Sequence, residues 1–478
     1  MLRRTKIVAT LGPASDDKDT MCSMINAGMD VARLNFSHGD ADDHRRQVRT
    51  LRAAAKSCGR EIGIMGDLQG PKIRIRRFRN HSVELTDGDA FFLDNALGPT
   101  DGDQNGVSVA LDSLHEDINA GDVLLLNDGL ITLEVDRIDG TRIHTKIVHG
   151  GILSDNKGIN LKGGGLSAAA VTDVDKKNIE LAAELGLDFL AVSFVRNGDD
   201  VFEARELFHE AGGHGVIVAK VERVEAVENI NAIIEAADVV MVARGDLGVE
   251  MGYAELTGIQ KKIIRNTRKQ HKIVITATQM MESMIHNPVP TRAEVSDVSN
   301  AVMDGTDAVM LSGETAVGAY PVEAIRTMGE ICIGAEKFPL AVGRTSHRLD
   351  DHFELVDEAI AMAVMYTANH MSVKAIIALT ETGSTTRWMS RIRSDIPIYA
   401  FTPHVETSRR VAMYRGVYPV SFVIDSGKPR RLYQDIFDTL LANNLVEIDE
   451  LAIVTKGDID GVSGSTNEMK IVKIISPS

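Results

Sequence analysis

The sequence has little cysteine, no long apolar run and no excess of basic charge. Its 478 residues include only Cys22, Cys58 and Cys332. This odd, sparse set contains no C-x-x-C pair, which excludes a disulfide framework and the common zinc and dithiol motifs. We expect each cysteine to be a small buried apolar residue in a reducing compartment. No apolar stretch approaches the roughly 18–20 residues that a membrane-spanning helix needs.

The charge balance excludes another class of partner. The formal net charge is -16, which argues against nucleic-acid binding because such proteins usually carry a basic patch. A phosphorylated substrate remains compatible, since a small site can be locally basic in an acidic protein. The N-terminal sequence runs directly into a strand-like segment without the apolar core of a signal peptide. We therefore expect a cytoplasmic protein without a membrane partner.

The common phosphate-binding and zinc motifs are also missing. The chain has no G-x-x-x-x-G-K-[ST] loop, no protein-kinase motif set and no H-E-x-x-H. Any nucleotide must therefore be held in another way.

What the chain does contain is a regular alternation of short apolar runs with helical stretches. Continuous apolar strands are typical of a parallel sheet covered on both faces, and eight such units predict a TIM (β/α)8 barrel. Helices are expected at Ala254–His271 and Tyr320–Lys337. The eight runs are Lys6–Leu11, Met29–Phe36, Glu61–Leu68, Asp188–Val195, Gly215–Val221, Asp238–Ala243, Ile273–Thr278 and Asp307–Leu311.

Two regions depart from this alternation. Residues 71–166 contain short strand-like runs separated by Asp-Gly and Gly-Asp turns, which predicts a β-rich lid domain inserted in a barrel loop, with Gly163–Gly165 as its return hinge. After about residue 345, a helical stretch at 351–370 and five further strands predict an open α/β domain. We expect the barrel to comprise 1–70 and 167–345, and the C-terminal domain 346–478.

Polar and charged residues follow the predicted barrel strands directly. In this fold, catalytic groups lie at the carboxyl ends of the strands, whereas ordinary loop polarity would place Ser, Asn and Gly there at random. The residues are Arg33, Asn35, Ser37, Asp67, Ser193, Lys220, Glu222, Arg244, Asp246, Thr278, Ser312 and Glu314.

The segments AKVER (219–223) and MVARGDLGVE (241–250) carry the strongest chemical signal. Lys220 and Glu222 are two apart on a strand and point the same way; alone they could form a structural ion pair. Gly245 allows close approach of backbone N–H groups, although a capping Asp246 after a turn glycine is as common. Together the segments offer two carboxylates for Mg²⁺ and one ammonium for a phosphoryl oxygen.

Two further segments reach the same end of the barrel. In ARLNFSHG (32–39), Arg33, Asn35 and Ser37 share one face and could hold phosphate oxygens or a monovalent cation; His38 could orient a phosphate or be a turn histidine. In DLQGPKIR (67–74), the charged residues either join the site or form a solvated start to the insertion. They are Asp67, Lys72 and Arg74.

These motifs resemble those of the pyruvate kinase family over essentially the whole chain. The resemblance implies the barrel, a β-barrel-like inserted lid and a regulatory C-terminal domain, in a homotetramer that transfers the phosphoryl group of phosphoenolpyruvate to ADP. The similar segments are RRTKIVATLGPAS (3–15), MDVARLNFSHG (29–39), GDLQGPKIR (66–74), NDGLI (127–131), KGINL (157–161), MVARGDLGVE (241–250), ITATQMMESM (275–284) and the long segment 290–321.

The resemblance also implies roles for individual residues. Glu222 and Asp246 would hold Mg²⁺, or Mn²⁺ in its place. Lys220 and Arg33 would contact the transferring phosphoryl group, the backbone at Gly245 and Asp246 the substrate carboxylate, and Thr278 would serve protonation of the enolate carbon through water. The nucleotide would face the turn at Thr10–Pro13 and the residues Asn35, His38, Arg74 and Asp128.

One departure from many relatives concerns K⁺. Lys72 stands where K⁺-dependent members carry Glu, and together with Leu68 it resembles the K⁺-independent branch. An ammonium group can replace a monovalent cation beside the phosphates, so K⁺ is not expected to be required. The residues of the monovalent-cation site elsewhere in the family are present: Asn35, Ser37, Asp67 and Leu68.

The C-terminal domain contains two candidate effector loops, TETGST (380–385) and GVSGSTN (461–467). The first could form a phosphate nest; both could equally be ordinary turns. Glu381 stands where some fructose-bisphosphate-activated relatives have Lys, which favours a sugar monophosphate or nucleotide. The tentative site comprises Thr380, Thr382, Gly383, Ser384, Thr385, Gly464 and Ser465.

Two other functions fit the sequence less well. Another Mg²⁺-dependent barrel acting on pyruvate or phosphoenolpyruvate, such as an aldolase or mutase, would not explain Lys220, Thr278 or the lid. A binding protein with a dead site would have lost Lys220, Glu222 or Asp246, and all three are present.

Overall fold

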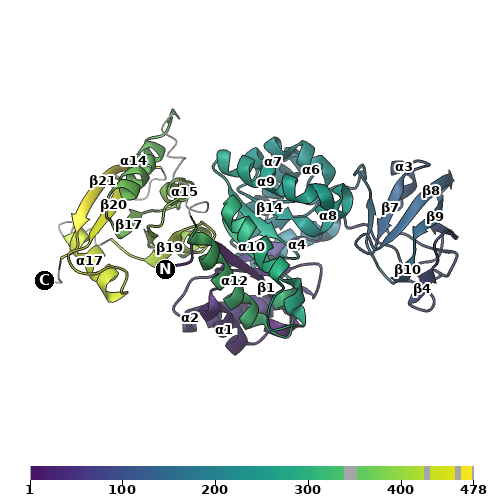
Figure 1. The fold of residues 1–478 in the computed structure, drawn as a ribbon, viewed down its shortest axis with the longest axis horizontal. Helices are drawn as coiled ribbons and strands as arrows, with labels where there is room; N and C mark the ends of the chain where they lie inside the picture. The colour runs from purple at the N-terminus through teal and green to yellow at the C-terminus, as the bar shows by residue number, and fades with distance from the viewer. Residues whose placement is uncertain (1, 339–351, 425–430, 458–463, 476–478) are drawn as a thin grey trace.

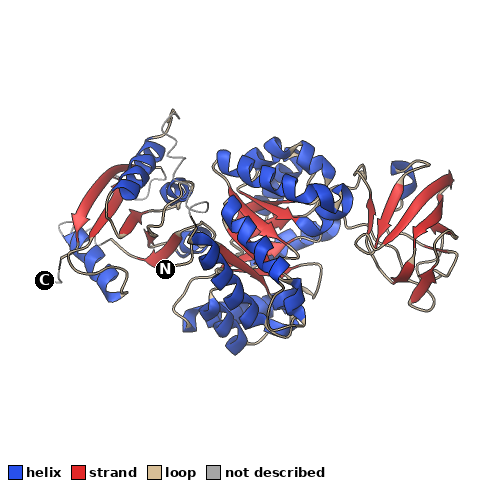
Figure 2. Cartoon of the chain, in the orientation of Figure 1, coloured by secondary structure: helices blue, strands red, loops and turns tan. Residues whose placement is uncertain are grey.

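The computed structural model of the chain describes residues 2–338, 352–424, 431–457 and 464–475. It consists of three bodies in a row (Figure 1): the inserted domain at one end, the barrel in the centre and the C-terminal domain at the other end. Helices surround the central strands, whereas the inserted domain is mainly strand (Figure 2). Among the described residues, no helix combines the length and apolarity needed to cross a membrane.

The eight predicted apolar runs form one closed parallel barrel, which confirms the predicted fold class. Its strand order is β1-β16-β15-β14-β13-β12-β3-β2. Nearly every strand residue is buried because helices cover the outside and side chains fill the inside. The strands are β1 Lys6–Thr10, β2 Val31–Asn35, β3 Gly63–Asp67, β12 Phe189–Val192, β13 Val216–Val221, β14 Val239–Ala243, β15 Ile273–Ala277 and β16 Ala308–Leu311.

The helices around the barrel begin at capping residues that the sequence supplies. Asp40, Thr172 and Thr291 each accept hydrogen bonds from the first turn of their helix, which satisfies backbone donors that have no partner within the helix. The outer helices are α1 Lys18–Ala27, α2 Ala41–Ser57, α4 Asp173–Glu184, α5 Gly198–Glu210, α6 Val224–Glu228, α7 Ile230–Ala236, α9 Tyr253–Lys269, α10 Arg292–Asp304 and α12 Pro321–Glu336. Shorter helices in the loops are η1 Pro13–Ser15, α8 Arg244–Met251, η2 Glu282–Ile285 and α11 Gly313–Ala316.

The two-residue period of the strands determines which side chains enter the barrel. On β13, Ile217 and Ala219 pack in the core shared with the helices, whereas Val218 packs in the interior core. Lys220 and then Glu222 continue the row of Val218. The strand pattern therefore directs both charged side chains into the mouth of the barrel.

The inserted domain interrupts the barrel between β3 and α4. It has a six-stranded sheet of order β11-β7-β8-β9-β5-β6 and a two-stranded sheet β10-β4, which share one apolar core. Its elements are β4 Ser82–Leu85, β5 Ala90–Asp94, β6 Gly106–Val107, α3 Leu114–Asp117, β7 Val123–Leu126, β8 Ile131–Asp139, β9 Arg142–His149, β10 Gly151–Ser154 and β11 Ile159–Leu161.

The C-terminal domain is an open sheet of order β19-β18-β17-β20-β21, parallel except for β21. Its residues Val417 and Met365 belong to the same core as the barrel interior, so the domain closes the amino-terminal end of the barrel. The predicted boundary at 345/346 lies outside the described residues, as does the start of the predicted 351–370 helix. The elements are α14 Val356–His370, β17 Ala375–Leu379, α15 Ser384–Ser390, β18 Ile398–Thr402, α16 Val405–Val411, β19 Val417–Ser421, α17 Leu432–Ala442, β20 Leu451–Gly457 and β21 Thr466–Lys473.

Candidate active site

Three strand ends bring charged side chains together inside the mouth of the barrel, and a fourth adds a hydroxyl group. Lys220 Nζ lies 3.0 Å from Asp67 Oδ1 and 3.0 Å from Glu222 Oε1, and it donates to Ser193 Oγ at 2.6 Å. Arg33 Nε lies 2.5 Å from Asp67 Oδ2. The structure therefore unites Arg33, Asp67, Lys220 and Glu222, as the sequence predicted, and adds the Ser193 hydroxyl as a direct partner of Lys220.

The electrostatics of this cluster keep the Lys220 ammonium charged. Burial lowers the pKa of Lys220, but the Asp67 and Glu222 carboxylates outweigh burial and leave this pKa raised. Burial favours a neutral Asp67, yet Arg33 and Lys220 hold its pKa below the usual value. The pKa of Glu222 is raised by burial and, despite Lys220, by the charges of Asp246 and Asp67. Repulsion between these carboxylates would be relieved by an added cation.

A strained turn forms the next part of the site. Thr278 follows β15 with φ of 64°, a value that is rare for a β-branched residue and is a hallmark of functional sites. Its Oγ1 accepts a hydrogen bond from Gly245 N at 2.8 Å and donates to Ala277 O at 2.7 Å. The predicted residues Gly245 and Thr278 are therefore in direct contact.

Arg244 holds this turn in place, a role that sequence reasoning missed. Its buried guanidinium donates to the carbonyl oxygens of Ala277, Thr278 and Gln279 and pairs with Asp297 at 2.6 Å. The only sequence signal was a charged residue directly behind an apolar strand, which does not show that the side chain turns toward the neighbouring strand end.

Lys72 connects the barrel to the inserted domain. Its Nζ lies 3.0 Å from Asp246 Oδ1 and 4.0 Å from Asp128 Oδ1. The glycine that follows Asp128 lies close to Val249 of α8, because a Cβ there would stand 3.8 Å from Val249 Cγ1. The predicted lid residue therefore lies against the edge of the barrel mouth.

The carboxylates of Glu222 and Asp246 suit a hard divalent cation. Protein Mg²⁺ sites commonly use one or two carboxylates, with substrate oxygens and water completing the shell. No group of three or more His, Cys, Asp or Glu side chains able to hold a metal exists within the described ranges. A two-carboxylate arrangement that depends on the substrate for further ligands fits these residues.

The predicted nucleotide residues divide into two groups. A cavity of about 550 Å³ is lined by Thr10–Pro13, Asn35 and His38. Gly12 is required in its wall, because a Cβ there would lie 2.6 Å from Ala316 O. Arg74 does not line this cavity and donates to Asn156 O at 3.0 Å, and Asp128 also stands outside it.

The oxygens of the predicted monovalent-cation site are engaged by protein donors. Asn35 Oδ1 accepts from Ser37 N at 3.2 Å, Leu68 O accepts from Ser193 Oγ at 2.7 Å, and Asp67 binds Arg33 and Lys220. Asn35 and Asp67 are register partners on β2 and β3. The four predicted residues thus lie together.

The two candidate effector loops also meet, in the C-terminal domain. Thr385 Oγ1 and Thr466 Oγ1 are 2.7 Å apart, and Thr380 Oγ1 accepts from Gly383 N at 2.9 Å. Ser384 Oγ, however, donates to the buried carboxylate of Asp357 at 3.0 Å. Of the predicted loop 461–467, residues 461–463 lie outside the described residues.

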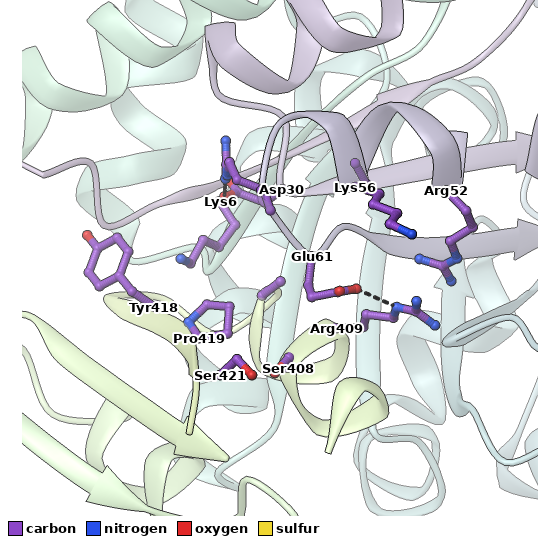
Figure 3. Close-up of a pocket in the computed structure, with 14 residues that line it drawn as sticks. Lys6, Asp30, Arg52, Lys56, Glu61, Ser408, Arg409, Tyr418, Pro419 and Ser421 are labelled. Carbon is purple, nitrogen blue, oxygen red and sulfur yellow. Dashed lines mark hydrogen bonds and ion pairs between the residues drawn. The ribbon is translucent and has the colours of Figure 1, made fainter. Parts of the chain in front are cut away.

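A different cavity, of about 620 Å³, lies between the barrel and the C-terminal domain (Figure 3). Basic residues gather there, including Lys6, Lys56 and Arg409, which pairs with Glu61 at 3.0 Å. None of the predicted site residues lines it. It is therefore separate from the active-site cluster.

A (β/α)8 barrel with Arg33 and Lys220 paired to Asp67 and Glu222 at the carboxyl ends of its strands is typical of barrel enzymes that act on small anionic substrates. Family models agree and are more specific: "Pyruvate kinase, barrel domain" matches residues 2–325 and "Pyruvate kinase, alpha/beta domain" matches residues 358–472. The chain therefore belongs to the pyruvate kinase family and is a phosphotransferase.

Relatives match along essentially the full length. The chain is 50% identical over 477 residues to Pyruvate kinase II of Salmonella typhimurium, covering 99% of both chains. It is 49% identical to a pyruvate kinase of Buchnera aphidicola from Schizaphis graminum, again over 99% of both. A pyruvate kinase of Geobacillus stearothermophilus is 42% identical, with 98% of this chain matching 80% of that protein.

Proposed function

We propose that this enzyme transfers the phosphoryl group of phosphoenolpyruvate to ADP, giving pyruvate and ATP, with Mg²⁺ or Mn²⁺ held by Glu222 and Asp246. The observation that carries the proposal is the cluster of Lys220, Arg33, Asp67 and Glu222 beside the Gly245–Thr278 contact. Phosphoryl transfer requires mainly positioning of the reactants and cationic stabilisation of the equatorial oxygens.

Each side chain has a part in this mechanism. Lys220 and Arg33 bind the oxygens of the migrating phosphoryl group, and their acidic partners keep both cations oriented. The substrate carboxylate takes the Gly245 N–H that now donates to Thr278 Oγ1, which frees that hydroxyl to deliver a proton through water to the enolate carbon. A divalent ion held by Glu222 and Asp246 would act as a Lewis acid that stabilises negative charge on the reacting oxygens. Closure of the inserted domain excludes water.

The decisive test is a lactate-dehydrogenase-coupled assay with phosphoenolpyruvate and ADP. We expect Lys220→Met to lose roughly 10³-fold or more in kcat, as when a key transition-state cation is removed. The matched control is Lys176→Met, which removes an exposed lysine that pairs with Asp173 on α4 and should retain activity. Full turnover by Lys220→Met, or no turnover by the parent chain with these substrates, would refute the proposal.

The second part of the proposal is activity without K⁺. The Lys72 ammonium stands beside Asp246 and Asp128, where it supplies the positive charge that K⁺ would otherwise bring. We expect unchanged kcat in buffers free of sodium and potassium. Lys72→Glu should depend on added K⁺, because it replaces this charge by a carboxylate. A strict K⁺ requirement of the parent enzyme would overturn this part.

The third part is activation by a sugar monophosphate or a nucleotide at the C-terminal loops. The meeting of the two loops through Thr385 and Thr466 supports it, whereas the Asp357 carboxylate must release Ser384 before a phosphate can bind there. The same coupled assay with candidate effectors tests it, and Thr385→Val should abolish any response while preserving basal turnover.

The proposed homotetramer is tested by light scattering on the full chain.

A further inference from the structure

Two of the three cysteines are more accessible than the sequence suggested. Cys332 is buried, as predicted, but the prediction is wrong for Cys22 and Cys58, which are half-buried. Cys22 lies in α1, and Cys58 caps the carboxyl end of α2. The proposed reaction uses neither thiol.

The two thiols lie against each other where α1 packs on α2. Cys58 Sγ is 3.8 Å from the carbonyl oxygen of Cys22. Cys22 Sγ is 3.7 Å from the carbonyl oxygen of Ala54, one turn before Cys58. The pKa of Cys58 is raised, first by burial and then by a hydrogen bond to Cys22, while Arg60 and Lys18 act in the opposite direction. Geometry and electrostatics thus describe a contacting thiol pair.

We propose that Cys22 and Cys58 form a reversible disulfide by exchange with a low-molecular-weight disulfide of the glutathione class. One thiolate attacks the reagent, forming a mixed disulfide and releasing one thiol. The second thiolate then attacks the protein sulfur, forming the Cys22–Cys58 bond and releasing the second thiol. Two protein thiols are oxidised, one reagent disulfide is reduced to two thiols, and the two cysteine protons pass to these products.

The position of the pair predicts what the bond does. Cys58 lies two residues after Lys56, which lines the cavity between the barrel and the C-terminal domain (Figure 3). This cavity is at the end of the barrel opposite Lys220. The bond would close a loop containing β2, the strand that carries Arg33. We expect it to tie α1 to α2 and to restrain the unfolded chain without moving the active site.

The test uses the full-length protein and oxidised glutathione. After incubation, free thiols are blocked with N-ethylmaleimide and the digested protein is mapped by mass spectrometry without reduction. We expect a linked peptide pair containing Cys22 and Cys58, which dithiothreitol separates. Cys332 serves as an internal control, because its thiol is fully buried, unlike those of Cys22 and Cys58, and should be out of reach of the reagent.

The variants Cys22→Ser and Cys58→Ser separate an internal bond from independent modification. Each should instead carry glutathione on its remaining half-buried cysteine. In the parent protein, oxidation should raise the apparent unfolding midpoint by roughly 2–6 °C and leave kcat unchanged, with neither single variant showing the rise. Glutathione on both cysteines without a linked peptide, a bond between two copies of the chain, or an unchanged midpoint would each overturn the proposal.

Discussion

At the scale of single residues, Thr278 is where backbone strain and predicted chemistry coincide. Its positive φ is held by Arg244, which bonds three carbonyl oxygens around the turn. Such strain costs on the order of 1–3 kcal/mol and persists only where surrounding contacts impose it. The hydroxyl is therefore held beside Gly245 N before any substrate arrives.

Replacing Thr278 by Val tests this placement. The change keeps the branched shape but removes the hydroxyl, so Gly245 N loses its partner and the proton path is interrupted. We expect kcat to fall roughly 10²-fold, with a smaller change in KM for phosphoenolpyruvate. The control is Thr276→Val on the same strand, whose hydroxyl bonds Thr306 inside the barrel wall; it should lose some stability but keep its kcat. A Thr278→Val enzyme with parental kcat would contradict the assigned role.

The sequence allowed part of this residue-level picture to be predicted. The shared direction of the Lys220 and Glu222 side chains could be predicted from the two-residue period of β13, whose apolar residues identify it as a strand. Arg244 sits in the same kind of position, yet its side chain turns sideways to the neighbouring strand end. The Ser384–Asp357 bond was equally hidden, because the partners are distant in sequence. The orientation of such side chains depends on tertiary contacts, which produce no periodic pattern in the sequence.

At the scale of elements, α8 places the carboxylic acid of Glu250 beside Gly163–Gly165, the predicted hinge of the inserted domain. Glu250, in α8, accepts from Asn160 Nδ2 at 3.4 Å and from Val224 N at 3.3 Å. Its backbone oxygen accepts from Gly163 N at 3.0 Å. Burial raises the pKa of Glu250 to about 7, although Arg223 acts against it.

This pKa gives a pH dependence with a definite sign. The folded state binds the proton more tightly than the unfolded state, whose pKa is near the usual 4.5. Stability from this group is complete below pH 4.5 and is lost as the pH rises through about 7. By pH 8 the loss should amount to roughly 1–3 kcal/mol.

Glu250→Gln removes the ionisation. We expect the variant's unfolding free energy, minus that of the parent, to increase between pH 5 and pH 8 by roughly 1–3 kcal/mol. Urea unfolding at several pH values measures this difference in unfolding free energy, in which the contributions of the other titrating groups cancel. The matched control is Glu255→Gln, at an exposed position of α9. A flat profile for Glu250→Gln would show that this carboxyl does not titrate in the folded state near pH 7.

Elements differed in how well the sequence revealed them. Each of the eight barrel strands lies within its predicted apolar run, because burial on both faces demands apolar residues at nearly every position. In the inserted domain, β6, β10 and β11 lie outside the strand-like runs of the sequence, which are Val83–Leu85, Ala90–Leu93, Val123–Leu126, Leu130–Val135 and Arg142–Val148. These short strands have only two to four residues, too few to show alternation, and their strand form depends on pairing with longer neighbours.

At the scale of the whole molecule, one buried ion pair joins the C-terminal domain to the barrel. Arg391, just after α15, lies 2.5 Å from Asp307 Oδ1, and both side chains are only 2% exposed. Arg391 also donates to Lys272 O at 2.7 Å, and Asp307 Oδ2 accepts from Val274 N at 2.9 Å. The ion pair thus connects the C-terminal domain to the starts of β15 and β16.

Removing one partner of this ion pair should destabilise the protein much more than removing both partners. Arg391→Met leaves the Asp307 carboxylate buried without its cation, which typically costs about 3–5 kcal/mol. We expect the barrel and C-terminal domain of the parent chain to unfold in one calorimetric transition and those of Arg391→Met in two, with the C-terminal domain unfolding first. Arg391→Met combined with Asp307→Asn should recover much of the loss, since no uncompensated charge remains. Equal destabilisation by the single and double variants would instead assign the coupling between the domains to their shared apolar core, in which Val417 and Met365 pack with the barrel interior.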